Sequence, residues 1–175
     1  DAVRAAFEQK AFIFWNHPGW RGQQADGVAR WYPEHDELLA KGWLHGIEVI
    51  NGREYYPEAH QWALDHGLTL ISNSDIHNPL NLDYEVHAGD HRPLTLVFAR
   101  DASVEAIREA LFARRTAVYS GHQLIGEARF LKPIFEASIR LLPSALQLKG
   151  KQMKYLQIHN ASDIRYELEL VGQVD

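Results

Sequence analysis

Residues 68–79 have the sequence LTLISNSDIHNP. The first four are apolar or β-branched and follow Gly67, so residues 68–72 predict a short buried strand. Polar residues begin directly after it, at Asn73, and include Asp75 and His77. In an extended turn, residues two apart project to the same side, so these two side chains can face one ligand. The stretch therefore predicts a strand whose carboxyl end carries a functional site.

Strands and helices alternate on both sides of this stretch. Further strands are predicted at residues 12–15, 46–51, 94–99 and 117–119, and helices at residues 33–41, 57–66 and 103–115. Pro33 and Pro57 suit first helical positions, and Ser103 is an expected N-cap. Nearly continuous apolar strands separated by helices are typical of a parallel sheet covered on both faces. The predicted fold class is α/β, in an open doubly wound or a barrel arrangement.

The pattern changes after Gly126. Residues 129–142 predict a helix mixed with Pro-bounded turns, and residues 155–158 and 166–171 predict a β-hairpin. A lone hairpin is marginal in water, so we expect the tail to pack on the α/β domain or to belong to a sheet with strands elsewhere. We expect three parts: an α/β domain at 1–126, a connecting segment at 127–146 and a β-rich appendage at 147–175.

Composition excludes several classes of protein. The 175 residues are 46% hydrophobic and 23% charged, and the mean hydropathy of −0.34 is that of a soluble globular chain. No apolar run is long enough to span a membrane. A net charge of −5 and a pI near 6.1, without a basic cluster, argue against a nucleic-acid partner and favour a small substrate. With no Cys and ten His, any metal must be held by imidazoles and carboxylates.

The candidate metal ligands follow two predicted strands. Asp75 and His77 follow the strand at 68–72, and His17, in the sequence NHPG, follows the strand at 12–15. Reactive groups of parallel α/β proteins lie beyond the carboxyl ends of strands, and this mixed nitrogen and oxygen set suits Zn²⁺ or Mn²⁺. Each motif also has a purely structural interpretation, because Asp75 could cap a turn, His77 could pack locally and His17 could be a turn residue.

Three further residues are candidates for supporting roles. Glu48 could orient a ligand His, or it could be an interior carboxylate paired with Arg53 or a Lys. Arg53 could bind a substrate phosphate through two hydrogen bonds, or it could lie on the surface. Asn16 could be a hydrogen-bond partner of the ligand motif or an ordinary turn residue. The loop at 78–93 is long enough to act as a substrate lid.

Three motifs together resemble a known family. The sequences NHPGW, GIEVING and SNSDIHNP, in that order, resemble the C-terminal half of a PHP (polymerase and histidinol phosphatase) domain over about residues 11–126. The resemblance implies a distorted, TIM-like (β/α)7 barrel with two or three metal ions, Zn, Mn or Fe, at its strand ends. It also implies that His17, Asp75 and His77 are metal ligands. Residues 114–139 and 159–168 are similar to the tail of PHP-type proteins that carry an appended β domain.

The chain also differs from that family pattern. The early His-x-His motif, a middle acidic ligand and a further His of the family are not found in residues 1–175. The chain starts at Asp1 without Met or a signal-peptide pattern, so we expect upstream residues to supply these ligands. The alternative is a degenerate, non-catalytic relative.

The resemblance implies hydrolysis of a small phosphate ester by metal-activated water. No activated Ser or Cys and no phosphate-binding Gly loop occurs in the sequence, which agrees with a mechanism that needs no protein nucleophile. Two alternatives remain open at this point: a metal-dependent amide or ester hydrolase on the same scaffold, and a non-catalytic binding module.

Overall fold

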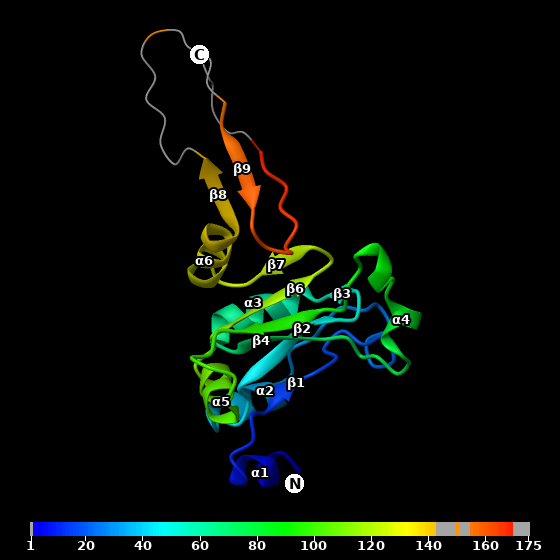
Figure 1. The fold of residues 1–175 in the computed structure, drawn as a ribbon. Helices are drawn as coiled ribbons and strands as arrows, with labels where there is room; N and C mark the ends of the chain where they lie inside the picture. The colour runs from blue at the N-terminus through cyan, green and yellow to red at the C-terminus, as the bar shows by residue number, and fades with distance from the viewer. Residues whose placement is uncertain (1, 143–149, 151–154, 170–175) are drawn as a thin grey trace. The chain divides into compact units, whose positions relative to one another are not determined.

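The computed structural model describes residues 2–142, 150 and 155–169 (Figure 1). The chain divides into two compact units, Asp1–Glu127 and Ala128–Asp175. Within the described residues, no helix has the length and apolar character needed to cross a membrane.

The first unit is built on a four-stranded sheet. Its strands are β1 (Phe14–Trp15), β2 (Gly46–Asn51), β3 (Glu54–Tyr55) and β4 (Thr69–Asn73). β2 is central and pairs in parallel with β1 on one side and with β4 on the other, while β3 turns back antiparallel onto the end of β2. The prediction of parallel strands is therefore confirmed for β1, β2 and β4. Their carboxyl ends lie at the same edge of the sheet.

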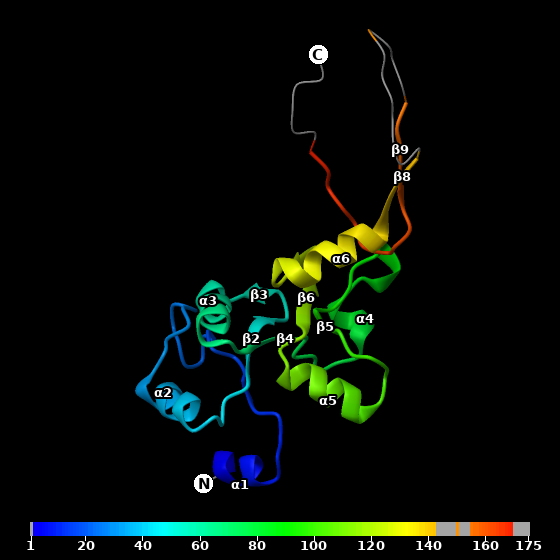
Figure 2. The ribbon, with the colours of Figure 1, turned by 90° about the vertical axis from the view of Figure 1, so that its left-hand side faces the viewer.

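The core forms on β2 because every residue from Gly46 to Ile50 is buried. Helix α3 (Pro57–His66) packs on this strand through the buried residues Ala59 and Ala63 (Figure 2). Pro57 starts α3 in its first turn, and Gly67 ends it in the left-handed conformation, at φ 64°, that favours glycine. The other helical segments of this unit are α1 (Ala2–Glu8), α2 (Pro33–Ala40), α4 (Leu80–Asp83), the 3₁₀ helix η1 (Val86–Ala88) and α5 (Val104–Phe112).

A second sheet in the same unit is antiparallel throughout. It contains β5 (Leu94–Val97), β6 (Thr116–Ser120) and β7 (Gln123–Ile125), and α5 connects β5 to β6. Ser103 caps α5 by accepting a hydrogen bond from the backbone N–H of Ala106, as predicted. The expectation that residues 94–99 continue the parallel sheet is wrong. An apolar run predicts a strand but not its direction, and β5 satisfies its backbone groups by antiparallel pairing with β6.

Threonine hydroxyls connect β4 to this second sheet. Thr116 Oγ1 donates to the carbonyl oxygen of Leu70 at 2.9 Å. Thr95 Oγ1 accepts from the backbone N–H of Ser72 at 2.9 Å and donates to its carbonyl oxygen at 3.0 Å. β4 is joined to β5 and β6 by these side-chain bonds and not by a backbone ladder, so the described strands form separate sheets. The expected TIM-like barrel is therefore not present in the described part of the chain, whose fold is mixed α/β.

The second unit contains α6 (Ala128–Ser138), β8 (Ile139–Leu142) and β9 (Gln157–Asn160). β8 and β9 pair antiparallel, so a helix and a strand occupy most of the stretch predicted to be a connecting segment. The predicted hairpin between residues 155–158 and 166–171 is wrong in its pairing. The Asn160 side chain bonds the backbone of Ser162 and Ile164 and forms a turn, after which residues 161–169 contain no strand. Residues 170 and 171 of that hairpin lie outside the described residues.

We predict that Thr116→Val will lower the free energy of unfolding by about 1–3 kcal/mol, because it leaves the buried Leu70 carbonyl without its donor. Urea denaturation followed by circular dichroism measures the effect. The reverse isosteric exchange Val104→Thr, at a residue that is 75% exposed, serves as the control and should change stability by less than about 0.5 kcal/mol. Equal stability of wild type and Thr116→Val would show that the hydroxyl bond between the sheets is unimportant.

Candidate functional site

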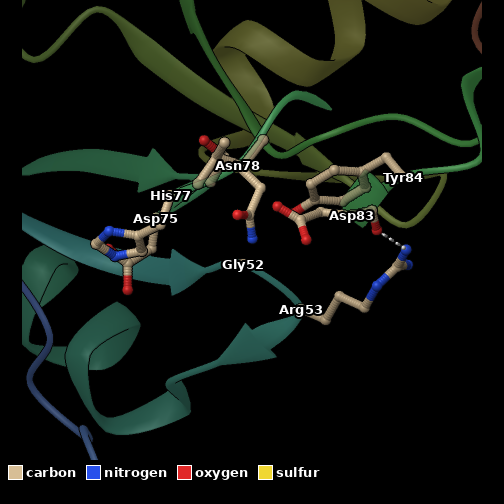
Figure 3. Close-up of a pocket in the computed structure, with 9 residues that line it drawn as sticks. Gly52, Arg53, Asp75, His77, Asn78, Asp83 and Tyr84 are labelled. Carbon is tan, nitrogen blue, oxygen red and sulfur yellow. Dashed lines mark hydrogen bonds and ion pairs between the residues drawn. The ribbon is translucent and has the colours of Figure 1, made fainter. Parts of the chain in front are cut away.

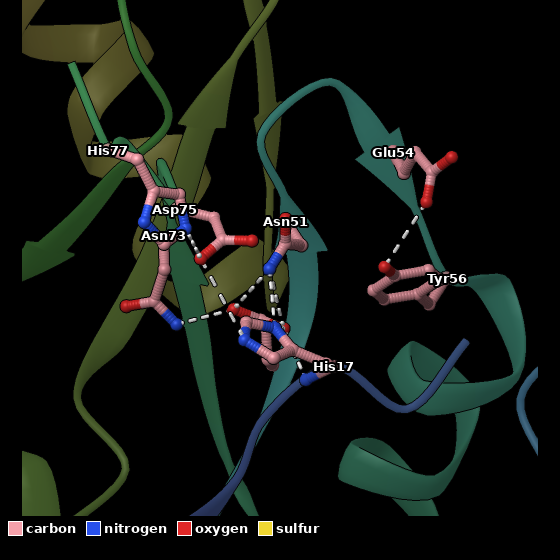
Figure 4. Close-up of polar contacts among 8 residues, drawn as sticks. His17, Asn51, Glu54, Tyr56, Asn73, Asp75 and His77 are labelled. Carbon is pink, nitrogen blue, oxygen red and sulfur yellow. Dashed lines mark hydrogen bonds and ion pairs between the residues drawn. The ribbon is translucent and has the colours of Figure 1, made fainter. Parts of the chain in front are cut away.

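The carboxyl ends of β1, β2 and β4 bring together side chains from distant parts of the sequence (Figure 4). His17 follows β1, Asn51 ends β2, and Asp75 and His77 follow β4. Glu48 projects from the middle of β2 toward the same group. The three residues predicted as metal ligands therefore lie in one place, as the position of their motifs after parallel strands indicated.

Glu48 is the centre of this group and is fully buried. Its Oε2 accepts hydrogen bonds from the backbone N–H of His17 at 2.6 Å and from His17 Nδ1 at 3.0 Å. Its Oε1 accepts from Asn73 Nδ2 at 2.6 Å. Glu48 thus pairs with His17 and Asn73, and Arg53 contacts other residues. Of the two kinds of partner weighed for Glu48, the described residues show a histidine and not Arg53 or a Lys.

The contact with Glu48 determines which nitrogen of His17 can bind a ligand. A carboxylate only accepts hydrogen bonds, so Nδ1 carries the proton and Nε2 keeps a free lone pair. This tautomer requires that Asn51 Nδ2, a donor that lies 2.5 Å from Nδ1, directs its protons to the oxygens of Glu48 at 3.4 Å. The role of Asn51 was not predicted, although its place at the end of the strand that carries Glu48 is visible in the sequence.

The Nε2 atoms of both histidines face one carboxylate oxygen. His17 Nε2 lies 3.9 Å from Asp75 Oδ1, and His77 Nε2 lies 3.4 Å from the same atom. Two ligand atoms bound to one tetrahedral zinc at about 2.0–2.2 Å are roughly 3.4 Å apart, so these spacings are close to those of neighbouring ligands. Two imidazoles and a carboxylate also have the donor chemistry that Zn²⁺ or Mn²⁺ accepts.

The ligand geometry is nevertheless incomplete in this part of the protein. Within the described residues, no group of three or more His, Asp or Glu side chains has the arrangement needed to hold a metal ion. The side chain of His77 is 83% exposed, and in the part of the chain that the structure describes its imidazole has one polar contact, with Asp75. The chain therefore presents two pairs of suitably spaced ligand atoms around Asp75.

Two of these residues have strained backbones. His17 has φ 56° and Asp75 has φ 50°, both in the left-handed region that residues other than glycine rarely adopt. Such a conformation costs on the order of 1–3 kcal/mol per residue and persists only where surrounding contacts impose it. Lys10, Arg114 and His122 adopt the same conformation outside this group, so the conformation by itself does not distinguish a functional turn from a local one.

A cavity of about 250 Å³ lies beside Asp75 and His77, and Arg53 and Tyr84 line its other side (Figure 3). The Arg53 guanidinium donates to Asp90 Oδ2 at 2.6 Å and lies over the Tyr84 ring. Its hydrogen bond lowers the pKa of Asp90 below the usual range. Arg53 is thus occupied by a protein carboxylate in this structure.

The remaining candidates have other surroundings. The side chain of Asn16 makes no hydrogen bond within the described residues. In the loop at 78–93, the His91 ring stacks on Tyr119 with a centroid distance of 4.3 Å, and Arg53 ties Asp90 to the first sheet. The loop is therefore anchored at its C-terminal end.

Comparison with known proteins adds one relative. No family model matches the chain, and no curated protein matches it. A solved structure from Bacteroides vulgatus ATCC 8482, a two-domain protein containing a predicted PHP-like metal-dependent phosphoesterase, is 46% identical in sequence with a TM-score of 0.82. The chain shares the fold of the part of that protein with which it aligns. The alignment covers 93% of this chain and 46% of that chain, so residues 1–175 span less than half the length of the relative.

We predict that Glu48→Gln will destabilise the protein by about 1–3 kcal/mol, because the new amide N–H₂ faces hydrogen-bond donors in a fully buried position. It should also change the tautomer of His17, which ¹⁵N NMR of the imidazole detects. Glu54→Gln is the control, since Glu54 is exposed and accepts one 3.4 Å bond from Tyr56. A Glu48→Gln protein with wild-type stability and an unchanged His17 tautomer would contradict the orienting role.

Proposed function

We propose that this chain is the C-terminal part of a PHP-type metal-dependent phosphoesterase that hydrolyses a small phosphate ester. The observation that carries the proposal is the convergence of His17 Nε2 and His77 Nε2 on Asp75 Oδ1, with the other nitrogen of His17 bound to Glu48. The likeness to a protein described as a predicted metal-dependent phosphoesterase supports the same activity.

In this proposal each residue has a separate task. His17 and His77 supply neutral nitrogen ligands, and Asp75 supplies the negative charge that offsets a cation. Glu48 keeps His17 in the tautomer that exposes Nε2, and Asn73 holds Glu48 in turn. The bound divalent ions, Zn, Mn or Fe, supply an activated water and positive charge for the phosphoryl oxygens. Ligands from outside residues 1–175 complete the site.

We predict that Asp75→Asn in the complete protein will lower the rate of phosphate-ester hydrolysis by roughly 100-fold or more and weaken metal binding, while the fold is retained. The carboxamide keeps the shape of the side chain but removes its charge. Hydrolysis of p-nitrophenyl phosphate is measured after chelation and after addition of Mn²⁺ or Zn²⁺, and bound metal by elemental analysis. Asp65→Asn, an exposed carboxylate on α3, is the control and should behave as wild type.

Three outcomes would contradict this proposal in different ways. Equal and metal-insensitive rates in wild type and Asp75→Asn would exclude the phosphoesterase. Metal-dependent cleavage of p-nitrophenyl acetate without cleavage of the phosphate would instead assign an ester hydrolase. Absence of metal from the complete wild-type protein would favour a non-catalytic binding module.

A further inference from the structure

Two cavities meet at Ser74, directly before Asp75, and they differ in charge. The first, of about 250 Å³, contains Arg53 together with the carboxylates of Asp75 and Asp83. The second, of about 290 Å³, lies on the other side of the end of β4. Its lining consists of Ser72, Asn73, Ser74, Arg92, Pro93, Leu94 and Thr95, so it contains a cation and no acidic residue. An anion is therefore favoured in the second cavity over the first.

The two arginines also differ in the hydrogen bonds that they have already made. Arg53 donates to Asp90 and to the carbonyl oxygen of Asp83. The guanidinium of Arg92 has no hydrogen-bond or ion-pair partner among the described residues. A guanidinium offers five N–H donors in a planar fork that matches phosphate oxygens. Arg92, which the sequence did not single out, is thus the arginine with donors available to a ligand.

The hydroxyl groups of the second cavity also differ in whether they already make hydrogen bonds. Thr95 Oγ1 already donates its one proton to the carbonyl oxygen of Ser72, so it has no donor left for an anion. Ser74 Oγ has no partner among the described residues, and Ser74 belongs to both cavities. The residue that lines both cavities and directly precedes Asp75 therefore carries a hydroxyl that has no partner among the described residues.

The backbone that carries Arg92 is held on both sides. The His91 imidazole bonds the carbonyl oxygen of Arg92 at 2.9 Å and stacks on Tyr119. Pro93 is buried and restricts the backbone of the residue before it. Upstream, Asp90 accepts from the backbone N–H of His91 and from Arg53. Arg53 is accordingly a positioning residue that anchors the segment from which Arg92 extends.

We propose that Arg92 and Ser74 form a binding subsite for a phosphate-type oxyanion beside the candidate metal centre. The identification of this anion with part of a substrate rests on the proposed function, but the binding of the anion does not. The anion is the scissile phosphoryl group or a second anionic group of the same ester.

The test is titration of the metal-free chain with inorganic phosphate at constant ionic strength, followed by ¹⁵N NMR of the Ser74 amide and the arginine Nε–H groups. Wild type should bind phosphate. The affinity of Arg92→Gln should be lower by about tenfold or more, and the affinity of Arg92→Lys should lie between the two. Arg100→Gln is the control, since Arg100 is 88% exposed and contacts Asp101. The backbone spectra of the variants show whether they are folded.

The proposal is overturned if wild type does not bind phosphate, or if Arg92→Gln binds as wild type does. Equal weakening in Arg92→Gln and Arg100→Gln also overturns it, because the effect is then one of net charge. The measurement needs neither metal nor turnover, so its failure leaves the phosphoesterase proposal intact, and loss of that proposal leaves phosphate binding intact.

Kinetics of the complete protein then identify the anion. If Arg92 binds the scissile group, Arg92→Gln lowers kcat/KM by the same factor for phenyl phosphate and for an ester with a second phosphate. If it binds a second group, only the latter ester is affected, mainly through KM. An unchanged kcat/KM for both esters overturns the role of the subsite in substrate binding.

Discussion

The burial of the Glu48 carboxylate is the constraint on which the rest of the site depends. A carboxylate inside a protein is tolerated only when its oxygens are hydrogen-bonded, and Glu48 takes its donors from the ends of two neighbouring strands. His17 beyond β1 and Asn73 on β4 are therefore fixed relative to β2. The register shift between Glu48 and Ile50 lies at the same point of the β2–β4 pair. The group that organises the ligands thus also joins the three parallel strands.

The strained turns at His17 and Asp75 follow from this arrangement. The His17 N–H reaches Glu48 Oε2 while the residue has positive φ, so the hydrogen bond offsets part of the conformational cost. Among the described residues, no comparable bond fixes the side chain of Asp75, which is part exposed and lies near the two imidazoles. Of the three candidate ligands, His17 is thus held by the core, and Asp75 and His77 are exposed at the edge of the sheet. A cation would add the attraction that this exposed pair lacks.

Local signals explain what could be predicted. The apolar run of β2, the Pro57 and Gly67 boundaries of α3 and the Ser103 cap depend on neighbouring residues, and all three match the structure. The direction of β5 and the partner of β9 depend on long-range pairing, which neither periodicity nor composition determines. The clustering of His17, Asp75 and His77 was predictable because parallel strands end at one edge. The hydrogen-bond partners of Glu48 could not be predicted from the sequence, because they depend on the register of β2 and β4.

The charges of Arg53 and Arg92 also depend on long-range contacts that the sequence does not reveal. Arg53 follows β2 and is the obvious phosphate candidate in the sequence, but Asp90, 37 residues later, neutralises it. The Arg53–Asp90 ion pair has two effects at the edge of the sheet. It neutralises the charge of Arg53, and it anchors the segment that carries Arg92. Acidic residues then lie on one side of Ser74 and the free guanidinium on the other. A ligand that reached both cavities would therefore meet an asymmetric field, in which an anionic group is favoured on the side of Arg92.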